Sequence, residues 1–188
     1  MQHEKMRRLV LAAMFAAITA VTAQLVIPLG FTPVPFTLAL IAIFLTGALL
    51  EPQTAFLAQL AYRLIGAAGA PVFSYFSGGL QKLAGPAGGY LLAYPFMALT
   101  AALFLKRFGR GFLRYCAAML LSLFVCYTLG TLQLLVLSGM SPMEALAAGV
   151  LPFAVFDIVK AALSAVLASA LSRSLGPSRL LAALLLPP

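Results

Sequence analysis

Charged residues are scarce in this chain of 188 residues, and acidic ones most of all. Only 9% of the residues are charged, and Asp and Glu together number four. Soluble domains carry about 25% charged residues, whereas this chain is 63% hydrophobic with a mean hydropathy of +1.08. We therefore expect an all-α integral membrane protein. The length accommodates about six spanning helices of about 20 residues each, which predicts a single membrane domain over residues 1–188, folded as one compact bundle.

Histidine, cysteine and nucleotide-binding motifs are almost as scarce. His3 is the one histidine and precedes the first apolar run, so no histidine-based metal site or Ser-His or Cys-His catalytic pair can form in the membrane. Cys116 and Cys126 lie on one predicted helix, about 15 Å apart and too far for a disulfide. No GxxxxGK[ST] motif occurs. Uphill transport would then draw its energy from a gradient or from another subunit.

Six apolar segments are long enough to be read as helices. The first is longer than the roughly 7–15 residues of a signal-peptide core, so we interpret it as a spanning helix. Glu51 should end the second helix, because the proline that follows it disfavours helix there and suits the start of the third. The predicted spans are residues 8–28, 36–50, 53–68, 87–105, 112–137 and 151–171.

Two connections carry further signals. Residues 71–89 are rich in Gly and Pro and are expected to form a loop between helices three and four. The string SPME at residues 141–144 has the form of a capping box and predicts a short helix from residue 142. Pro152 then either kinks this helix or opens the last span.

The basic residues predict the topology. In a six-helix arrangement, nine of the twelve fall on one side: Lys5, Arg7, Arg8, Lys106, Arg107, Arg110, Arg114, Arg173 and Arg179. By the positive-inside rule this side is the cytoplasm, which places both termini there and the glycine-rich loop outside. The net charge of +8 is then explained by topology, and a nucleic-acid partner is not expected.

Asp157 and Lys160 stand three residues apart inside the last apolar segment. On a helix they share one face, together with Ser164 one turn further on. Ionisable groups inside a span cost about 2.5–3.5 kcal/mol each on insertion scales and usually mark a pathway, a relay or a ligand site. The alternative is an ion pair that neutralises itself and locks two helices together.

Residues 69–90 are the second informative segment. Glycine permits positive φ and close backbone approach, and irregular backbone at membrane depth is tolerated where it is buried or lines a cavity. Phe73, Tyr75, Phe76 and Tyr90 supply aromatic surfaces along it. An ordinary exterior loop whose turns need glycine remains an equal alternative.

A set of ordered motifs runs through the chain: TPVPFTL at 32–38, GAPVF at 69–73, SGG at 77–79, GPAGGY at 85–90, YTLGT at 127–131, and LPF at 151–153 with Asp157 and Lys160. Together these motifs resemble the BioY family, the biotin-capturing S components of energy-coupling-factor (ECF) transporters. The similarity runs from about residue 6 to residue 175. The resemblance implies a six-helix protein that binds biotin from outside and pairs with a transmembrane coupling subunit and two ATPase subunits.

The resemblance also implies site residues. Asp157 and Lys160 match the acidic and basic positions of the family's ligand site, where they would satisfy the neutral ureido ring of biotin from both sides. The aliphatic and thioether parts of biotin would suit the aromatic residues of the 73–90 loop, and this loop and the 28–36 loop are expected to close over the ligand. The candidate set is completed by Phe73, Tyr75, Gly78, Gly79, Tyr90 and Arg63. Arg63 could reach the ligand carboxylate, pair with Asp157 or extend to the interface, and we favour the first.

The chain departs from the family pattern at several positions. Phe156 and Ala87 stand where many relatives have Gly and Thr, and Ser74 and Tyr75 stand where relatives often have smaller or amide-bearing residues. These changes could reshape the pocket.

Helix one carries Ala12, Ala16 and Ala20 at a spacing of four, with Ala13 and Ala17 on the neighbouring stripe. Small residues at this spacing let helices approach closely in lipid. The stripe could serve internal packing. S components use a similar stripe to meet the coupling subunit, so the resemblance implies a partner interface here, in a register that the sequence does not decide.

The combined hypothesis is a non-enzymatic, high-affinity biotin-binding subunit in a bacterial or archaeal cytoplasmic membrane, with biotin as transported ligand and no cofactor. One alternative is a self-sufficient transporter or facilitator of biotin or another small acid, with Asp157 as proton carrier. Another is a membrane-embedded enzyme or scaffold that uses the polar pair for structure.

Overall fold

The computed structural model of the chain is mostly helical and describes residues 2–28, 30 and 34–175. Its larger helices are α1 (Gln2–Ala23), α2 (Ala39–Leu49), α3 (Pro52–Ala67), α5 (Gly88–Phe108), α6 (Phe112–Ser138) and α8 (Leu151–Leu175). Its smaller elements are β1 (Val26–Ile27), β2 (Phe36–Thr37), the 3-10 turn η1 (Ser74–Phe76), α4 (Leu80–Ala84) and α7 (Pro142–Gly149). The TPVPFTL motif lies partly outside the described residues, and Arg179, one of the nine basic residues of the topology prediction, lies wholly outside them.

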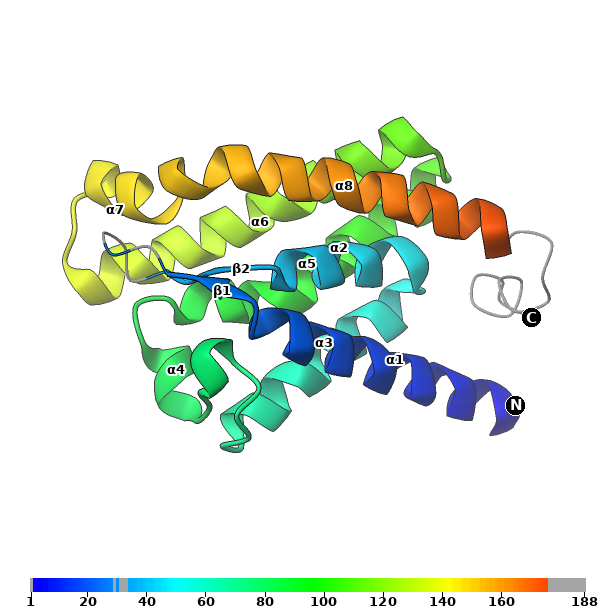
Figure 1. Cartoon of the computed structure of the whole chain (residues 1–188), viewed down its shortest axis with the longest axis horizontal. Coiled ribbons are helices and arrows are strands. Elements are labelled where there is room, and N and C mark those ends of the chain that lie inside the picture. The colour runs from blue at the N-terminus through cyan, green and yellow to red at the C-terminus, as the bar shows by residue number, and fades with distance from the viewer. Residues whose placement is uncertain (1, 29, 31–33, 176–188) are drawn as a thin grey trace.

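The bundle has two ends with different content. Figure 1 shows the start of α1, the end of α8 and the α5–α6 turn at one end, and the β1–β2 hairpin, α4 and α7 at the other. The first end therefore gathers the basic segments of the sequence. There Arg8 forms ion pairs with Glu4 (2.8 Å) and with Glu51 of the α2–α3 turn (3.0 Å).

Four helices of the described chain are long and apolar enough to cross a membrane: α1, α5, α6 and α8. By contrast α2 has 11 residues and α3 has 16, lengths of about 16 and 24 Å. The predicted second span, 36–50, is too long because residues 36 and 37 pair with Ile27 and Val26 as β2. For the same reason the predicted first span, 8–28, ends early, at Ala23.

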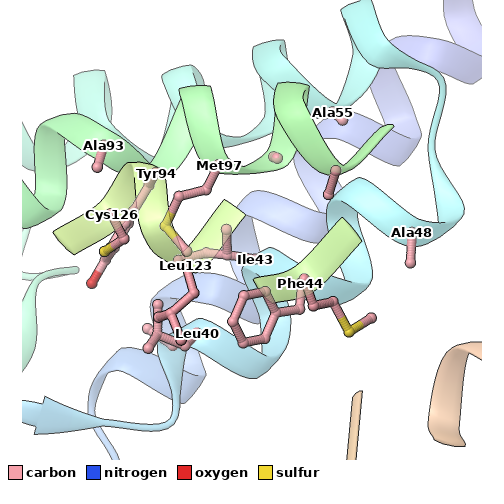
Figure 2. Packing of buried hydrophobic residues seen from close by; sticks show 14 of the residues in the cluster. Leu40, Ile43, Phe44, Ala48, Ala55, Ala93, Tyr94, Met97, Leu123 and Cys126 are labelled. Atoms are coloured by element: carbon pink, nitrogen blue, oxygen red, sulfur yellow. The ribbon is translucent and has the colours of Figure 1, made fainter. Parts of the chain in front are cut away.

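The short helix α2 lies at the centre of the bundle, where α1, α3, α5 and α8 pack around it. Ile43 and Phe44 are fully buried, and Figure 2 shows them close to Met97 of α5 and Leu123 of α6. Gly47 faces the backbone of α5, and a side chain there would collide with Ala98 and Ala101. A helix covered on all sides can be apolar throughout, which explains why α2 shows no polar face.

One buried polar network crosses this core. The Gln59 amide on α3 donates to the hydroxyls of Thr19 on α1 (3.0 Å) and Thr46 on α2 (2.9 Å). Each threonine hydroxyl donates in turn to a carbonyl of its own helix, so both are free to accept from Gln59. The network joins three helices in a region with little water to compete for these bonds.

The connections follow the sequence signals in part. The capping box is present, since Ser141 N–H donates to Glu144 (2.8 Å) and Glu144 N–H donates back to Ser141, and α7 begins at Pro142 as predicted. Pro152 is the second residue of α8 and so opens the last helix. Residues 71–89, predicted to be all loop, instead contain η1 and the five-residue helix α4.

Candidate functional site

Asp157 and Lys160 form a buried ion pair on α8. Lys160 Nζ lies 2.8 Å from Asp157 Oδ1; Asp157 is 3% exposed and Lys160 is 5% exposed. The rest of the inward face of α8 is apolar or small, with Phe153, Ala161 and Ala165 also buried. The predicted i, i+3 placement on one buried face is therefore confirmed.

Side chains from distant elements complete the pair. The Tyr127 hydroxyl on α6 donates to Asp157 Oδ2 (2.8 Å), and Lys160 Nζ donates to the Thr37 carbonyl of β2 (2.8 Å). The ammonium also lies 3.7 Å from the centre of the Phe36 ring, a cation–π contact. The β1–β2 pairing fixes the backbone of both hairpin residues, so the hairpin holds them over α8.

A cavity of about 260 Å³ opens beside this group. Thr37, Tyr127, Asp157 and Lys160 form one polar part of its wall, and Ser74, Ser77 and Lys82 add further polar groups. Aromatic residues form much of the remaining wall: Phe36, Phe73, Tyr75, Tyr90, Tyr94 and Phe153. Small-molecule sites combine an apolar lining with a few polar groups that fix orientation, and typically measure about 300–1,000 Å³. The cavity therefore suits a small ligand with an apolar body and a compact polar end.

The segment 72–77 covers one side of the cavity and is held by Gln24, just after α1. The Gln24 amide donates to the carbonyls of Val72 and Phe73 (both 3.1 Å), and its oxygen accepts from Phe76 N–H (2.8 Å). Tyr75 and Phe76 have φ of 61° and 51°, which is strained for residues with side chains. Hydrogen bonds from a separate element therefore help to fix a conformation that the segment would not adopt unaided.

Tyr90 is fixed from the other side. Its hydroxyl donates to the Gly149 carbonyl of α7 (2.9 Å), and its ring lies over Gly130 of α6, where any side chain would collide with it. These contacts connect α5, α6 and α7 at the cavity wall.

Comparison with known proteins identifies the fold and the family. The model of the BioY family matches residues 1–177. This chain belongs to the BioY family. It is 41% identical to a probable biotin transporter BioY of Pyrococcus horikoshii and 37% identical to the biotin transporter BioY of Thermotoga maritima, each match covering 89% of this chain and 97% of the relative.

Solved structures agree with this assignment. The crystal structure of the S-component for biotin from an ECF-type ABC transporter superposes with a TM-score of 0.84 at 26% identity, covering 92% of this chain and 94% of that one. The S component of a bacterial ECF transporter superposes with a TM-score of 0.55 at 20% identity, which shows a shared fold. With these transporter relatives and several apolar helices, the BioY chain is a multi-pass protein of the cell membrane.

Five of the eight predicted site residues lie in the cavity wall of this BioY chain: Asp157, Lys160, Phe73, Tyr75 and Tyr90. Gly78 and Gly79 do not. Gly79 has a φ of +93° and its N–H donates to the Gly66 carbonyl (2.7 Å), while a side chain on Gly78 would strike Ala70. Their role is to close the backbone of the loop, because only residues without a Cβ fit this crossing.

Arg63 is a second correction. Its guanidinium donates to the Leu92 carbonyl of α5 (3.1 Å), and the residue does not line the cavity. The favoured interpretation, contact with a ligand carboxylate, has no support from its position. Ser164 is buried on the same face of α8 as the ion pair but is likewise absent from the cavity wall.

The two alanine stripes on α1 of the BioY chain differ in burial. Ala12 and Ala16 are 6% and 5% exposed and pack inside the bundle, with Ala20 half-buried, whereas Ala13 and Ala17 are exposed. The first register therefore serves internal packing.

The sequence reasoning missed several residues of the site. Tyr127 belongs to the YTLGT motif, and a phenol in an apolar helix was a usable signal. Thr37 contributes a backbone carbonyl, which no residue type reveals. Gln24 and Lys82, the latter exposed on α4 and lining the cavity, carried no local signal of their own.

Proposed function

We propose that the chain captures biotin at the outer face of the membrane and acts as the substrate-binding subunit of an ATP-driven uptake system. The observation that carries this proposal is the Asp157–Lys160–Tyr127 group at the wall of an aromatic cavity in a BioY chain. Curated relatives that are biotin transporters, and a superposable S-component for biotin, support it.

The group has hydrogen-bonding capacity to spare. An ammonium has three N–H donors, and Lys160 uses two of them on Asp157 and Thr37. An ionised carboxylate accepts at about four positions, and Asp157 is occupied by Lys160 and Tyr127. The free donor suits the ureido carbonyl of biotin and the free carboxylate positions suit its N–H groups. In a low-dielectric site these bonds are charge-assisted and strong.

The aromatic wall suits the rest of the ligand. Phe36, Phe73 and Phe153 present apolar surface beside the polar group, against which the thiophane ring and aliphatic chain of biotin can pack. Phe156, where many relatives have glycine, makes an edge contact with the Phe36 ring (5.4 Å between centres) rather than filling the cavity. Phe156 therefore supports the cavity wall by packing against Phe36, outside the cavity itself.

The membrane arrangement belongs to the same proposal. We place both termini in the cytoplasm and count α2 and α3 as short spans, giving six helices in one domain, with the cavity end and the glycine-rich loop outside. The gathering of the basic segments at one end of the bundle supports this orientation. The exposed stripe of Ala13 and Ala17 is the surface we assign to a coupling subunit, which would connect the chain to two ATPase subunits.

Equilibrium binding of radiolabelled biotin to the purified, monodisperse protein tests the function. Asp157→Asn and Lys160→Ala should each abolish tight binding, while Arg63→Gln, away from the cavity, should preserve it. Tight binding untouched by the first two would make the ion pair structural. A well-folded protein that binds no biotin would exclude the proposal, and proton-driven uptake by the chain alone in vesicles would exclude its dependence on an ATPase.

A further inference from the structure

Three formal charges line the cavity, and they are not balanced. Asp157 and Lys160 neutralise each other at 2.8 Å, which leaves Lys82 on α4 as an additional cation in the wall. Within the described part of the chain, Lys82 makes no ion pair or side-chain hydrogen bond. The cavity wall therefore carries a net formal charge of +1, which a monoanionic ligand would neutralise.

The two cationic positions differ in setting. Lys160 is 5% exposed and already bonded to Asp157 and to the Thr37 carbonyl. Lys82 is exposed, on a short helix that lies with the β1–β2 hairpin at one end of the bundle. The cavity therefore has a buried, internally neutral polar group and, nearer the solvent, a free ammonium.

The position of Lys82 is well defined by its neighbours. The Gln133 amide on α6 donates to the carbonyls of Leu83 (2.7 Å) and Gly85 (2.8 Å), which fastens the end of α4 to the bundle. The Ser74 side of the wall faces the same cavity, and its hydroxyl adds an uncharged group that can donate. Arg63, the other cation considered for this role, is engaged by Leu92 elsewhere.

We propose that Lys82 binds the carboxylate of the ligand and thereby fixes its orientation, with the uncharged polar ring at Asp157 and Lys160 and the carboxylate at the solvent side. This inference rests on the proposed function and adds a residue that selects the ionised acid over uncharged analogues. A lysine contributes through charge and without strict geometry, so arginine can replace it.

The test compares biotin with biotinamide, in which a neutral carboxamide replaces the carboxylate. Affinities are measured by competition against radiolabelled biotin for the wild type, Lys82→Gln, Lys82→Arg and Lys106→Gln, the last an exposed lysine at the opposite end of α5. We expect Lys82→Gln to lose about tenfold in affinity for biotin, the scale of one charge-assisted contact. Its affinity for biotinamide should stay within about twofold of wild type, as should both affinities of Lys106→Gln.

Two further measurements test the role of the charge on Lys82. Lys82→Arg should keep the preference for biotin, and added salt should reduce that preference in the wild type, because a solvent-side charge pair is screened. An equal loss for both ligands in Lys82→Gln would show a structural lysine and overturn the inference. Unchanged binding of both ligands would overturn it as well, while leaving the biotin function intact. A wild type that binds neither ligand would overturn the function and the inference together.

Discussion

The Tyr127 hydroxyl donates to Asp157 Oδ2 at 2.8 Å, while Oδ1 of the same carboxylate takes the ammonium of Lys160. The tyrosine comes from α6 and the aspartate from α8, so this bond joins two helices across the cavity wall. It leaves the carboxylate held in one plane, with its remaining acceptor positions set by two fixed partners. A carboxylate fixed in this way loses little further freedom when a ligand binds.

Replacing Tyr127 by phenylalanine tests this relationship. We expect about a 5- to 30-fold loss of biotin affinity, since one hydrogen bond to a charged group contributes about 1.5–3 kcal/mol and part of it is recovered by relaxation. Tyr115→Phe is the matched control, because its hydroxyl bonds Ser172 (2.7 Å) outside the cavity wall. Titration of both purified variants with labelled biotin measures the effect. Equal affinities in the two variants would exclude a role for Tyr127 in shaping the site.

The ion pair itself separates stability from binding. Asp157→Asn or Lys160→Met alone leaves an unpaired buried charge, which costs about 3–5 kcal/mol. The double substitution removes both charges and should recover most of the unfolding temperature lost by either single variant. Biotin binding should stay absent in the double variant, because the ureido ring has lost both charged partners. Thermal unfolding in detergent and biotin binding, measured on the same samples, check this. Recovered binding in the double variant would show that the ring is recognised elsewhere.

The shared face of Asp157 and Lys160 on α8 could be predicted from the sequence, but only some of the residues that contact this face could. The three-residue spacing of Asp157 and Lys160 predicts a shared face from helix geometry alone, and the structure confirms it. Thr37 could not be predicted, because its contact with Lys160 spans 123 positions of sequence and depends on a hairpin of two residues per strand. Strands this short show no alternating pattern of apolar and polar residues, so both were included in the predicted helical spans 8–28 and 36–50.

Long side chains show a similar limit. Arg63 and Lys82 are both single cations in apolar or glycine-rich sequence, yet one bonds a neighbouring helix and the other lines the cavity. Which of these occurs depends on how α3 and α4 are rotated against α5, a property of the packed bundle. The bounds of α5 and α6 and the start of α7 were predicted within a few residues, because apolar length, Gly and the capping box are local signals.

Gln24 should control how long the ligand stays bound. It makes three hydrogen bonds to residues 72–76, and two residues of this segment have strained positive φ. Gln24→Ala removes the bonds, so we expect the segment to open more often and biotin to dissociate about tenfold faster. A chase of bound labelled biotin with excess unlabelled biotin measures the dissociation rate. Gln53→Ala, an exposed glutamine on α3, is the control. A dissociation rate equal to that of the control would mean that this segment does not limit release.

The two alanine registers of α1 should respond in opposite ways to a larger side chain. Ala16 is 5% exposed against the bundle, so Ala16→Leu overpacks the core and should lower stability by about 1–3 kcal/mol. Ala17 is exposed, so Ala17→Leu should leave folding and biotin binding unchanged and instead block close approach of a coupling subunit. Copurification with the energy-coupling subunits, alongside biotin binding by the isolated chain, distinguishes these effects. Normal copurification of Ala17→Leu would move the partner surface to another face of the bundle, since a leucine in this stripe would hold an opposing helix away.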